Sequence, residues 1–159
     1  TGVMGRKMFL NKCVALQKNR ALLKSKAQGW FLFFDVDAFK SINDTYGHLV
    51  GDEVLCGFAK RLEKALSPYG VVGRLGGDEF AAILHKPITE NALAALLDDL
   101  YKNLADILPQ QKVTCSIGVC SFTYPQEIRK LMYATDKALY KAKERGRACY
   151  VFGEAESKE

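Results

Sequence analysis

The hydrophobic positions of this chain change their period along its length. Residues 6–26 carry apolar positions at loosely helical spacing, and Gly29 separates them from the continuous apolar run 30–36. Such a run is typical of a central strand that is buried on both faces. From Val50 the apolar residues recur at i, i+3, i+4 and i+7, and Pro68 ends the pattern. This spacing predicts an amphipathic helix.

The second half of the chain begins with a hairpin signal. Two short strand-like runs, 70–75 and 79–84, flank Gly76 and Gly77. Consecutive glycines suit the positive φ angles of a tight turn. The remaining elements that we expect are, in order, a helix capped by Thr89 with its apolar face over 93–104, a strand at 113–122, a helix from Ile128 that ends at Gly146, and a strand at 149–152.

The order of these elements predicts the fold class. It is α-β-α-β-β-α-β-α-β, which contains two β-α-β crossovers and one hairpin. Crossovers give parallel neighbours and a hairpin gives antiparallel ones, so the sheet is expected to be mixed, with about five strands and with helices packed on its faces. We therefore predict a palm-like α+β fold. One domain is expected over residues 1–152, followed by a polar tail over 153–159.

The composition agrees with one folded domain and excludes several other classes. The chain has 159 residues, of which 48% are hydrophobic, so it can bury a core. No apolar run reaches the roughly 18–20 residues of a membrane span. The five cysteines are scattered and form no C-x-x-C pair, which favours a reduced, cytoplasmic compartment. The chain starts at Thr1 without an apolar leader, and we expect an excised domain.

Charge is distributed unevenly along the chain. The net charge is +5, yet residues 1–34 hold seven Lys or Arg and no acidic residue, while the rest holds sixteen basic and eighteen acidic residues. This asymmetry argues against a nucleic-acid-binding face spread over the domain. We expect no nucleic-acid partner and no membrane contact by the domain itself. The basic segment is interpreted as a solvated helix face, with a contact to acidic partners as the alternative.

Carboxylates gather at two predicted turns. Asp35 and Asp37 follow the buried strand, where a carboxylate is costly unless something compensates its charge. Asp78 and Glu79 follow the Gly-Gly turn. If the hairpin pairs beside the first strand, Asp35 and Asp78 converge, and such hard oxygen ligands suit Mg²⁺ or Mn²⁺. The alternative is that Asp35 is a helix N-cap and that the hairpin tip is merely solvated.

Four motifs then resemble a known family. GGDEF stands at residues 76–80, and residues 34–52 resemble the pattern D-x-D-x-F-K-x-I-N-D-x-x-G-H-x-x-G-D. Residues 140–147 are similar to a closing Y-x-A-K-x-x-G-R, and Thr1-Gly2 to an opening T-G. These motifs, in the right order and spacing, resemble the GGDEF domains of the diguanylate cyclases over almost the whole chain.

The resemblance implies an activity and an assembly. It implies condensation of two GTP molecules into cyclic di-GMP with release of two pyrophosphates, in bacterial signal transduction. It also implies a nucleotidyl-cyclase-like palm fold, a transient homodimer, and two Mg²⁺ or Mn²⁺ ions per active site. A noncatalytic GTP-binding module that regulates a fused partner is the alternative function, and a nucleotide-independent dimerisation module is a third.

The resemblance assigns the metal site and the catalytic carboxylates. Asp35, the Val36 carbonyl and Asp78 match metal-ligand positions, and Asp78 is the position often assigned as the base. Glu79 is implied to help hold the ions or to orient Asp78. Strand alternation is expected to point Glu79 to the other face of the sheet from Asp78.

Five further residues match substrate-contacting positions of the family. Asn43 and Asp52 match positions that read the guanine edge, and His48 matches another nucleotide contact. Lys143 and Arg147, expected four apart on one helical face, match a phosphate-contacting pair. Without the resemblance, the sequence favours a loop Asn, a helix-capping Asp and a turn His. For the two cations the alternative is a favourable placement at a helix C-terminus.

The sequence departs from the family pattern in a regulatory segment. The family's product-inhibition site uses R-x-x-D before the signature, and here the corresponding stretch runs from Ser67 to Gly70. We therefore expect no feedback site. Gly5 and Ala148 replace Asn residues that are common in the opening and closing motifs.

Overall fold

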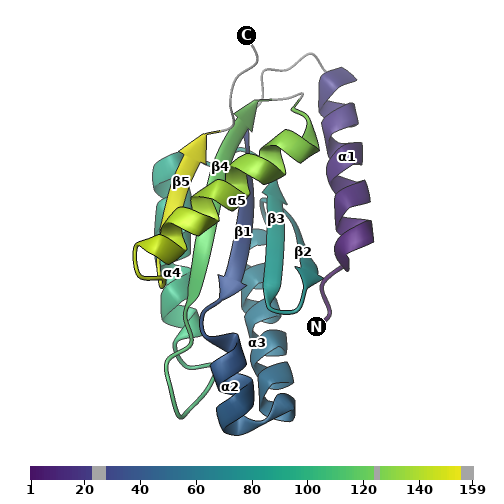
Figure 1. The fold of residues 1–159 in the computed structure, drawn as a ribbon. Coiled ribbons are helices and arrows are strands. Elements are labelled where there is room, and N and C mark those ends of the chain that lie inside the picture. The colour runs from purple at the N-terminus through teal and green to yellow at the C-terminus, as the bar shows by residue number, and fades with distance from the viewer. Residues whose placement is uncertain (23–27, 124–125, 155–159) are drawn as a thin grey trace.

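The computed structural model describes residues 1–22, 28–123 and 126–154, and its five strands form one sheet in the order β2-β3-β1-β4-β5 (Figure 1). The described elements are α1 (Arg6–Leu22), β1 (Gln28–Val36), α2 (Phe39–Tyr46), α3 (His48–Leu66), β2 (Gly70–Gly76), β3 (Glu79–Leu84), α4 (Glu90–Leu104), β4 (Cys115–Thr123), α5 (Ile128–Glu144) and β5 (Tyr150–Glu154). The five-stranded sheet and the α+β class predicted from the sequence are confirmed. One helix, α2, was not predicted.

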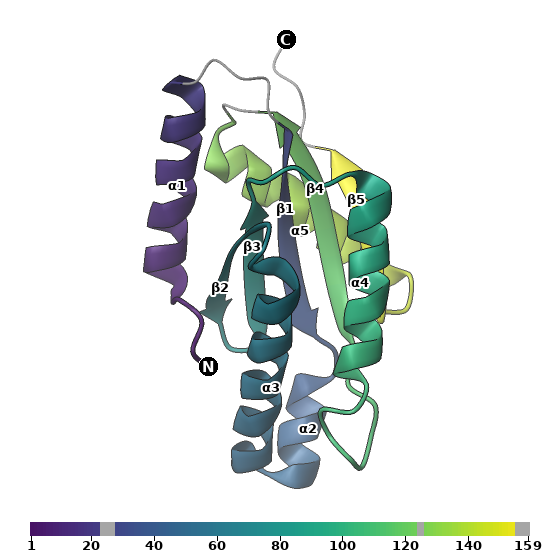
Figure 2. The same cartoon turned by 180° about the vertical axis from the view of Figure 1, so that it is seen from behind.

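Helices cover both faces of the sheet. Figures 1 and 2 show α3 and α4 on one face, and α5 with α1 on the other. The larger apolar core includes Phe34 and Phe58 and lies on the α3 and α4 side, whereas the second core includes Phe9 and Phe31 and lies beneath α1 and α5. Because Phe31 and Phe34 are both fully buried, β1 is buried on both faces, as its continuous apolar run predicts.

β1 lies at the centre of the sheet and positions the site. It pairs antiparallel with β3 and with β4, while β5 runs parallel to β4. The β2–β3 hairpin therefore lies beside β1, with Asp35 opposite Glu79. On β4, Gly118 lies so close to Thr135 and Leu139 that a Cβ would clash with their backbone atoms. This glycine allows α5 to pack directly against the sheet.

The unpredicted helix α2 forms a helical hairpin with α3 beyond the carboxyl end of β1 (Figure 1). Its N-cap is Ala38, in the left-handed region at φ 53°. Gly47, at φ 91°, separates the two helices, and its N–H donates to the carbonyl of Asn43 at 2.8 Å. α2 has eight residues, and Ile42 is the buried one among them. A helix this short shows too little periodicity to be recognised from a hydrophobic pattern.

Element ends differ by a few residues from the prediction. Helix α1 is described as far as Leu22, and the rest of the expected helix 6–26 lies outside the described residues. Strand β4 begins at Cys115, and β5 continues to Glu154. The predicted cap of α4 is confirmed, because the N–H of Ala92 donates to Thr89 Oγ1 at 3.2 Å.

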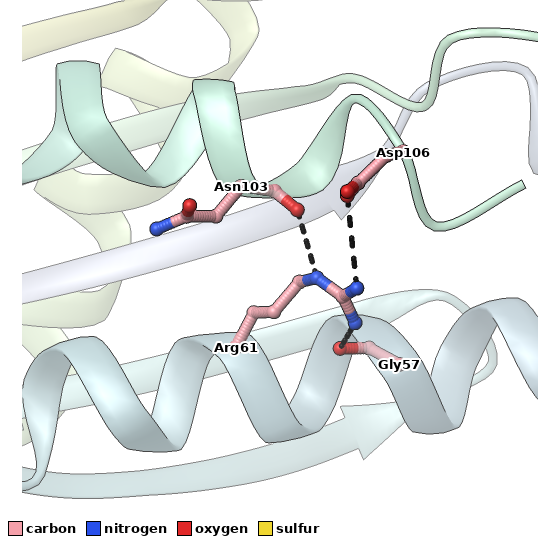
Figure 3. Close-up of polar contacts among 4 residues, drawn as sticks. All are labelled: Gly57, Arg61, Asn103 and Asp106. Atoms are coloured by element: carbon pink, nitrogen blue, oxygen red, sulfur yellow. Dashed lines mark hydrogen bonds and ion pairs between the residues drawn. The ribbon is translucent and has the colours of Figure 1, made fainter.

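A side chain ties α3 to the end of α4, on the face away from α5 (Figure 3). The guanidinium of Arg61 donates from Nε to the carbonyl of Asn103 at 2.8 Å and from Nη1 to the carbonyl of Gly57 at 3.0 Å. Its Nη2 lies 3.7 Å from the carboxylate of Asp106. Two carbonyl contacts and a partly exposed ion pair identify Arg61 as a structural link between the helices.

No helix in the described ranges has the length and apolarity that crossing a membrane requires. All five cysteines are free thiols, and Cys13, Cys115 and Cys120 are buried. Burial raises the pKa of Cys13 to about 12, so this thiol stays protonated and packs as a small apolar group.

Candidate active site

The carboxylates predicted to converge do converge. The N–H of Val36 donates to the carbonyl of Asp78 at 3.2 Å, which joins the end of β1 to the hairpin turn. This bond, with Asp35 opposite Glu79 in the β1–β3 register, brings the carboxyl groups of Asp35 and Asp78 beside each other. The pKa of Asp78 rises to about 6, first because the carboxyl is partly desolvated, and then because Asp35 is hydrogen-bonded and negatively charged beside it. Two carboxylates in contact create a site that favours a cation or a proton.

The turn that carries Asp78 is held by a residue that sequence reasoning left uninterpreted. Arg74 donates from Nε and Nη2 to the carbonyl of Gly77, at 3.0 and 2.7 Å. Gly77 has φ 50°, and the β2–β3 register shifts between Arg74 and Gly76. Arg74 therefore fixes a turn that glycine makes accessible. The position of Arg74 just before the signature could have drawn attention to this residue. Its contact with the turn, however, depends on the register shift, which the sequence does not reveal.

Lys143 reaches the carboxylate pair from α5. Its ammonium forms an ion pair with Asp35 Oδ2, and the side chains of Lys143 and Asp35 are 33% and 15% exposed. Lys143 belongs to the last turn of α5 and, with Glu79, lines a small cavity of about 70 Å³. The cation predicted to contact phosphate thus lies directly beside a predicted metal ligand.

Glu79 lies on the same face of the sheet as Asp35, because the two are opposite each other in the β1–β3 register. Alternation was expected to point Glu79 to the other face from Asp78, and the register places Glu79 beside Asp35. Asp78 belongs to the turn rather than to β3, so strand alternation does not relate it to Glu79. Glu79 is exposed and remains close to the site.

Arg147 does not lie on a helical face with Lys143, which corrects the expected pairing. α5 ends at Glu144, Gly146 follows with φ 105°, and Arg147 is itself left-handed at φ 67°. The N–H of Arg147 donates to the carbonyl of Ala142 at 3.1 Å, which closes the helix end. The spacing of four residues therefore spans a helix terminus, and Arg147 is an exposed residue of the α5–β5 loop.

The predicted base-reading residues lie on the α2–α3 hairpin. Asn43 is half-buried within α2, and a Cβ at Gly51 would clash with its Oδ1, so the amide packs against the α3 backbone. Asp52 and His48 are exposed on the first turns of α3. Asn43 is not a loop residue, and Gly47 rather than Asp52 is the N-cap of α3. Both structural alternatives for these residues are therefore wrong.

The donor set fits a magnesium-type ion. Within the residues that the structure describes, no group of three or more His, Cys, Asp or Glu could hold a metal. Asp35 and Asp78 supply two carboxylates, and Val36, the residue after Asp35, offers its backbone carbonyl. Mg²⁺ commonly takes one or two carboxylates and completes its shell with water and substrate phosphates. The pKa of Asp78 is raised first by partial burial and then by Asp35, so a cation bound between the two carboxylates would stabilise their ionised forms.

Asp37 is a second residue whose role the motifs did not indicate. Ser116 Oγ donates to its Oδ1 at 2.7 Å, and Thr114 Oγ1 and the N–H of Ala148 donate to its Oδ2 at 2.8 and 2.9 Å. The short D-x-D spacing was the available signal. The three donors come from β4, from the segment before it and from the α5–β5 loop, so only the tertiary fold brings them together.

Comparison with known sequences identifies the family. Residues 1–149 match the family described as "Diguanylate cyclase, GGDEF domain". The chain belongs to this family of nucleotidyl cyclases, which act in cyclic di-GMP signalling. It is 41% identical over 122 residues to the probable diguanylate cyclase DgcC of Escherichia coli (strain K12), an alignment that covers 73% of this chain and 32% of that protein. The chain spans about a third of the length of the curated relatives that it matches.

Solved structures share the fold. Diguanylate cyclase SiaD of Pseudomonas aeruginosa, solved in complex with its activator SiaC, superimposes with a TM-score of 0.84 at 29% identity, over 96% of this chain and 59% of SiaD. The active GGEEF domain of a diguanylate cyclase from Vibrio cholerae superimposes with a TM-score of 0.81 at 28% identity, over 98% of this chain and 99% of that one. The palm-like fold expected from the sequence is confirmed.

Proposed function

We propose that this domain, residues 1–152, condenses two GTP molecules into cyclic di-GMP and releases two pyrophosphates. The contact between Asp35 and Asp78 at the end of the central strand is the observation that supports this most directly. In each of two steps the 3′-oxygen of one GTP bonds to the α-phosphorus of the other. The bond from that phosphorus to the bridging oxygen breaks, pyrophosphate leaves, and the hydroxyl proton passes to a base.

Asp78 is our candidate for that base. It stands at the signature position that the family resemblance assigns as the base, and it lies in the turn of the β2–β3 hairpin, directly beside the end of β1. Asp35, the Val36 carbonyl and Asp78 would hold Mg²⁺ or Mn²⁺, with two ions per site proposed from the family. When bound, the ions supply positive charge against the α-phosphate and the forming alkoxide. Glu79, on the same face as Asp35, would support this group from the strand.

The remaining candidates bind substrate. Lys143 already pairs with a carboxylate of the site and would turn to the phosphates when they arrive. Arg147 would add a second cation from the α5–β5 loop. Asn43 and Asp52 offer an amide and a carboxylate to the O6 acceptor and the N–H donors of guanine, with His48 as a further contact. Adenine has the reversed pattern and would leave both groups unpaired.

The reaction also implies partners. One site holds one GTP, so two protomers must face each other, and we propose a transient homodimer. A fused upstream sensory domain would control the encounter. Cytoplasmic GTP is the substrate source that this proposal requires.

Product analysis tests the proposal. The purified domain is incubated with GTP and Mg²⁺ or Mn²⁺, and chromatography quantifies cyclic di-GMP and pyrophosphate. We expect both, in a ratio of one to two, and a loss of at least ~10²-fold in Asp78→Ala, because a group acting on the transferred proton and charge is removed. Asp99→Asn, an exposed carboxylate on α4, is the matched control. GTP binding without product would favour the regulatory alternative, and no metal-dependent GTP binding would favour the dimerisation module.

A further inference from the structure

Asp37 joins three parts of the chain that are distant in sequence. Its carboxylate follows β1 and accepts from Thr114 and Ser116, 77 and 79 residues away, and from the N–H of Ala148, 111 residues away. Its own N–H donates to the carbonyl of Thr114 at 3.0 Å. One carboxylate thus fastens the end of β1 to β4 and to the α5–β5 loop.

The same three hydrogen bonds occupy the carboxylate of Asp37, which the D-x-D spacing places two residues from the candidate metal ligand Asp35. Oδ1 of Asp37 has one donor and Oδ2 has two, at 2.7 to 2.9 Å. Asp35, two residues earlier, instead contacts Asp78 and Lys143. A carboxylate that already accepts three hydrogen bonds is poorly available to a metal ion, so the two aspartates have different tasks.

The loop that Asp37 fastens adopts an unfavourable backbone conformation. Arg147 and Ala148 have φ angles of 67° and 50°, and neither is glycine. Consecutive left-handed residues with side chains persist only where surrounding contacts hold them. The N–H of Arg147 is bonded within the helix end, to Ala142, whereas the N–H of Ala148 is bonded to Asp37. Asp37 is therefore the side chain that holds this conformation from outside the loop.

We propose that Asp37 is a positioning residue that holds the α5–β5 loop so that Arg147 meets the triphosphate of the bound nucleotide. The nature of that ligand rests on the proposed function, whereas the anchoring itself rests on the hydrogen bonds. Asp37 touches no substrate in this role and acts through Arg147. A displaced cation is costly because small errors in the position of a binding group lower rate and affinity steeply.

Nucleotide binding to Asp37→Asn gives the first test. Asparagine keeps the shape of the side chain, but it is uncharged and accepts at one oxygen only. Its amide nitrogen cannot accept from the donors that face it, and the bonds that remain are no longer charge-assisted. We expect the dissociation constant of a non-hydrolysable GTP analogue with Mg²⁺ to rise about tenfold, and KM to change more than kcat. Asp99→Asn, an exposed residue of α4, which covers the face of the sheet away from α5 (Figure 2), should leave binding unchanged. Thr114→Val removes one donor and should shift binding the same way, by about threefold, even if Asp37→Asn folds poorly.

A double-mutant cycle separates positioning from general damage to the fold. In an Arg147→Ala background, Asp37→Asn should change the dissociation constant by less than about twofold, because the group it positions is gone. In an Asn43→Ala background the full tenfold effect should remain. An equal effect in both backgrounds, or no effect in the unaltered chain, would overturn the proposal.

Hydrogen exchange of the free protein tests the anchoring without nucleotide. Asp37→Asn should accelerate amide exchange at Ala148 at least tenfold, while the amide of Leu93 on α4 stays unchanged. Unchanged exchange at Ala148 would overturn the anchoring. If the unaltered chain binds no GTP analogue, the proposed function fails and the role of Arg147 fails with it, while exchange still decides the anchoring.

Discussion

The carboxyl group of Asp78 is destabilised in its ionised form by the fold around it. Partial burial removes water, and Asp35 adds both a hydrogen bond to the protonated form and a negative charge. The ammonium of Lys143 is paired with Asp35 rather than with Asp78. Two neighbouring carboxylates, with one ammonium beside them, form a group whose ionised state a bound cation would stabilise.

The first prediction concerns the pH dependence of stability without metal. Folding raises the pKa of Asp78 from 3.8 to about 6. The contribution of this carboxyl to the free energy of unfolding is therefore fully present below about pH 4 and is lost as pH rises through 6. In EDTA, Asp78→Asn should therefore melt higher than the unaltered chain at pH 8, by about 2–4 °C after allowance for solvent screening. The difference should vanish at pH 4. Thermal melts at pH 4, 6 and 8 check this, and a difference independent of pH would contradict it.

The second prediction concerns base selection. Asn43 packs against Gly51 and offers one amide to the guanine edge. Asn43→Ala should lower kcat/KM for GTP by about tenfold or more and change kcat/KM for ATP much less. The ratio of the two values is the measurement. A ratio that stays the same would show that Asn43 does not discriminate between the bases. Asn103→Ala, an exposed site near the end of α4, is the matched control.

Among the helices and strands, the hydrophobic pattern of the sequence predicted the long elements. It missed a short helix and misplaced a residue at a helix end. Long apolar periods predicted β1, α3 and α5, and the two glycines predicted the hairpin. The eight-residue α2 was missed because one buried residue gives no period. The sequence predicted that the helix ends at Gly146, yet the spacing of four residues was taken to place Arg147 on one helical face with Lys143. The helix ends at Glu144, before both Gly146 and Arg147.

Candidate site residues show the same division. The convergence of Asp35 and Asp78 was predictable, since Asp35 lies at the end of β1 and Asp78 lies in the turn of the hairpin that pairs beside it. The contacts of Arg74 with the turn and of Asp37 with Thr114 and Ser116 were not. They depend on a register shift and on tertiary packing, which no local pattern contains.

The third prediction tests the α5–β5 loop as an element under strain. Ala148 has φ 50°, a conformation that asparagine tolerates better than alanine. Ala148→Asn should stabilise the fold by about 0.5–1 kcal/mol, while its backbone bond to Asp37 is kept. Ala95→Asn, exposed within helix α4, should instead destabilise by a similar amount because asparagine is a weaker helix former. Chemical denaturation of both variants measures their free energies of unfolding relative to the unaltered chain. A change of the same sign in both variants would contradict the prediction.

At the scale of the whole molecule, inhibition by the product would need a binding site at the start of β2, where the family pattern has its product-inhibition motif. Gly70 is so close to Ile83 that a Cβ would clash with the backbone there, and Ser67 is the exposed C-cap of α3. The fourth prediction is that cyclic di-GMP inhibits synthesis weakly and competitively with GTP. Initial rates at several GTP concentrations check the pattern. Tight noncompetitive inhibition would contradict the expected absence of a feedback site.

Assembly is the other property of the whole molecule, because in the proposed reaction each new bond would join atoms held by two protomers. The described part of α1 is a helix whose first turn carries no acidic residue, and its basic side chains would resist self-pairing. The dimer should therefore be weak in this isolated chain. Synthesis per protomer is then limited by encounter between protomers.

The most direct measurement is the initial rate of cyclic di-GMP formation from GTP and Mg²⁺ over a roughly hundredfold range of protein concentration, with sedimentation in parallel. We expect cyclic di-GMP as the product and a rate per protomer that rises with protein concentration, so that the total rate approaches second order in protein where monomer dominates. A rate strictly proportional to protein in a monomeric sample, or no cyclic di-GMP at any concentration, would contradict it.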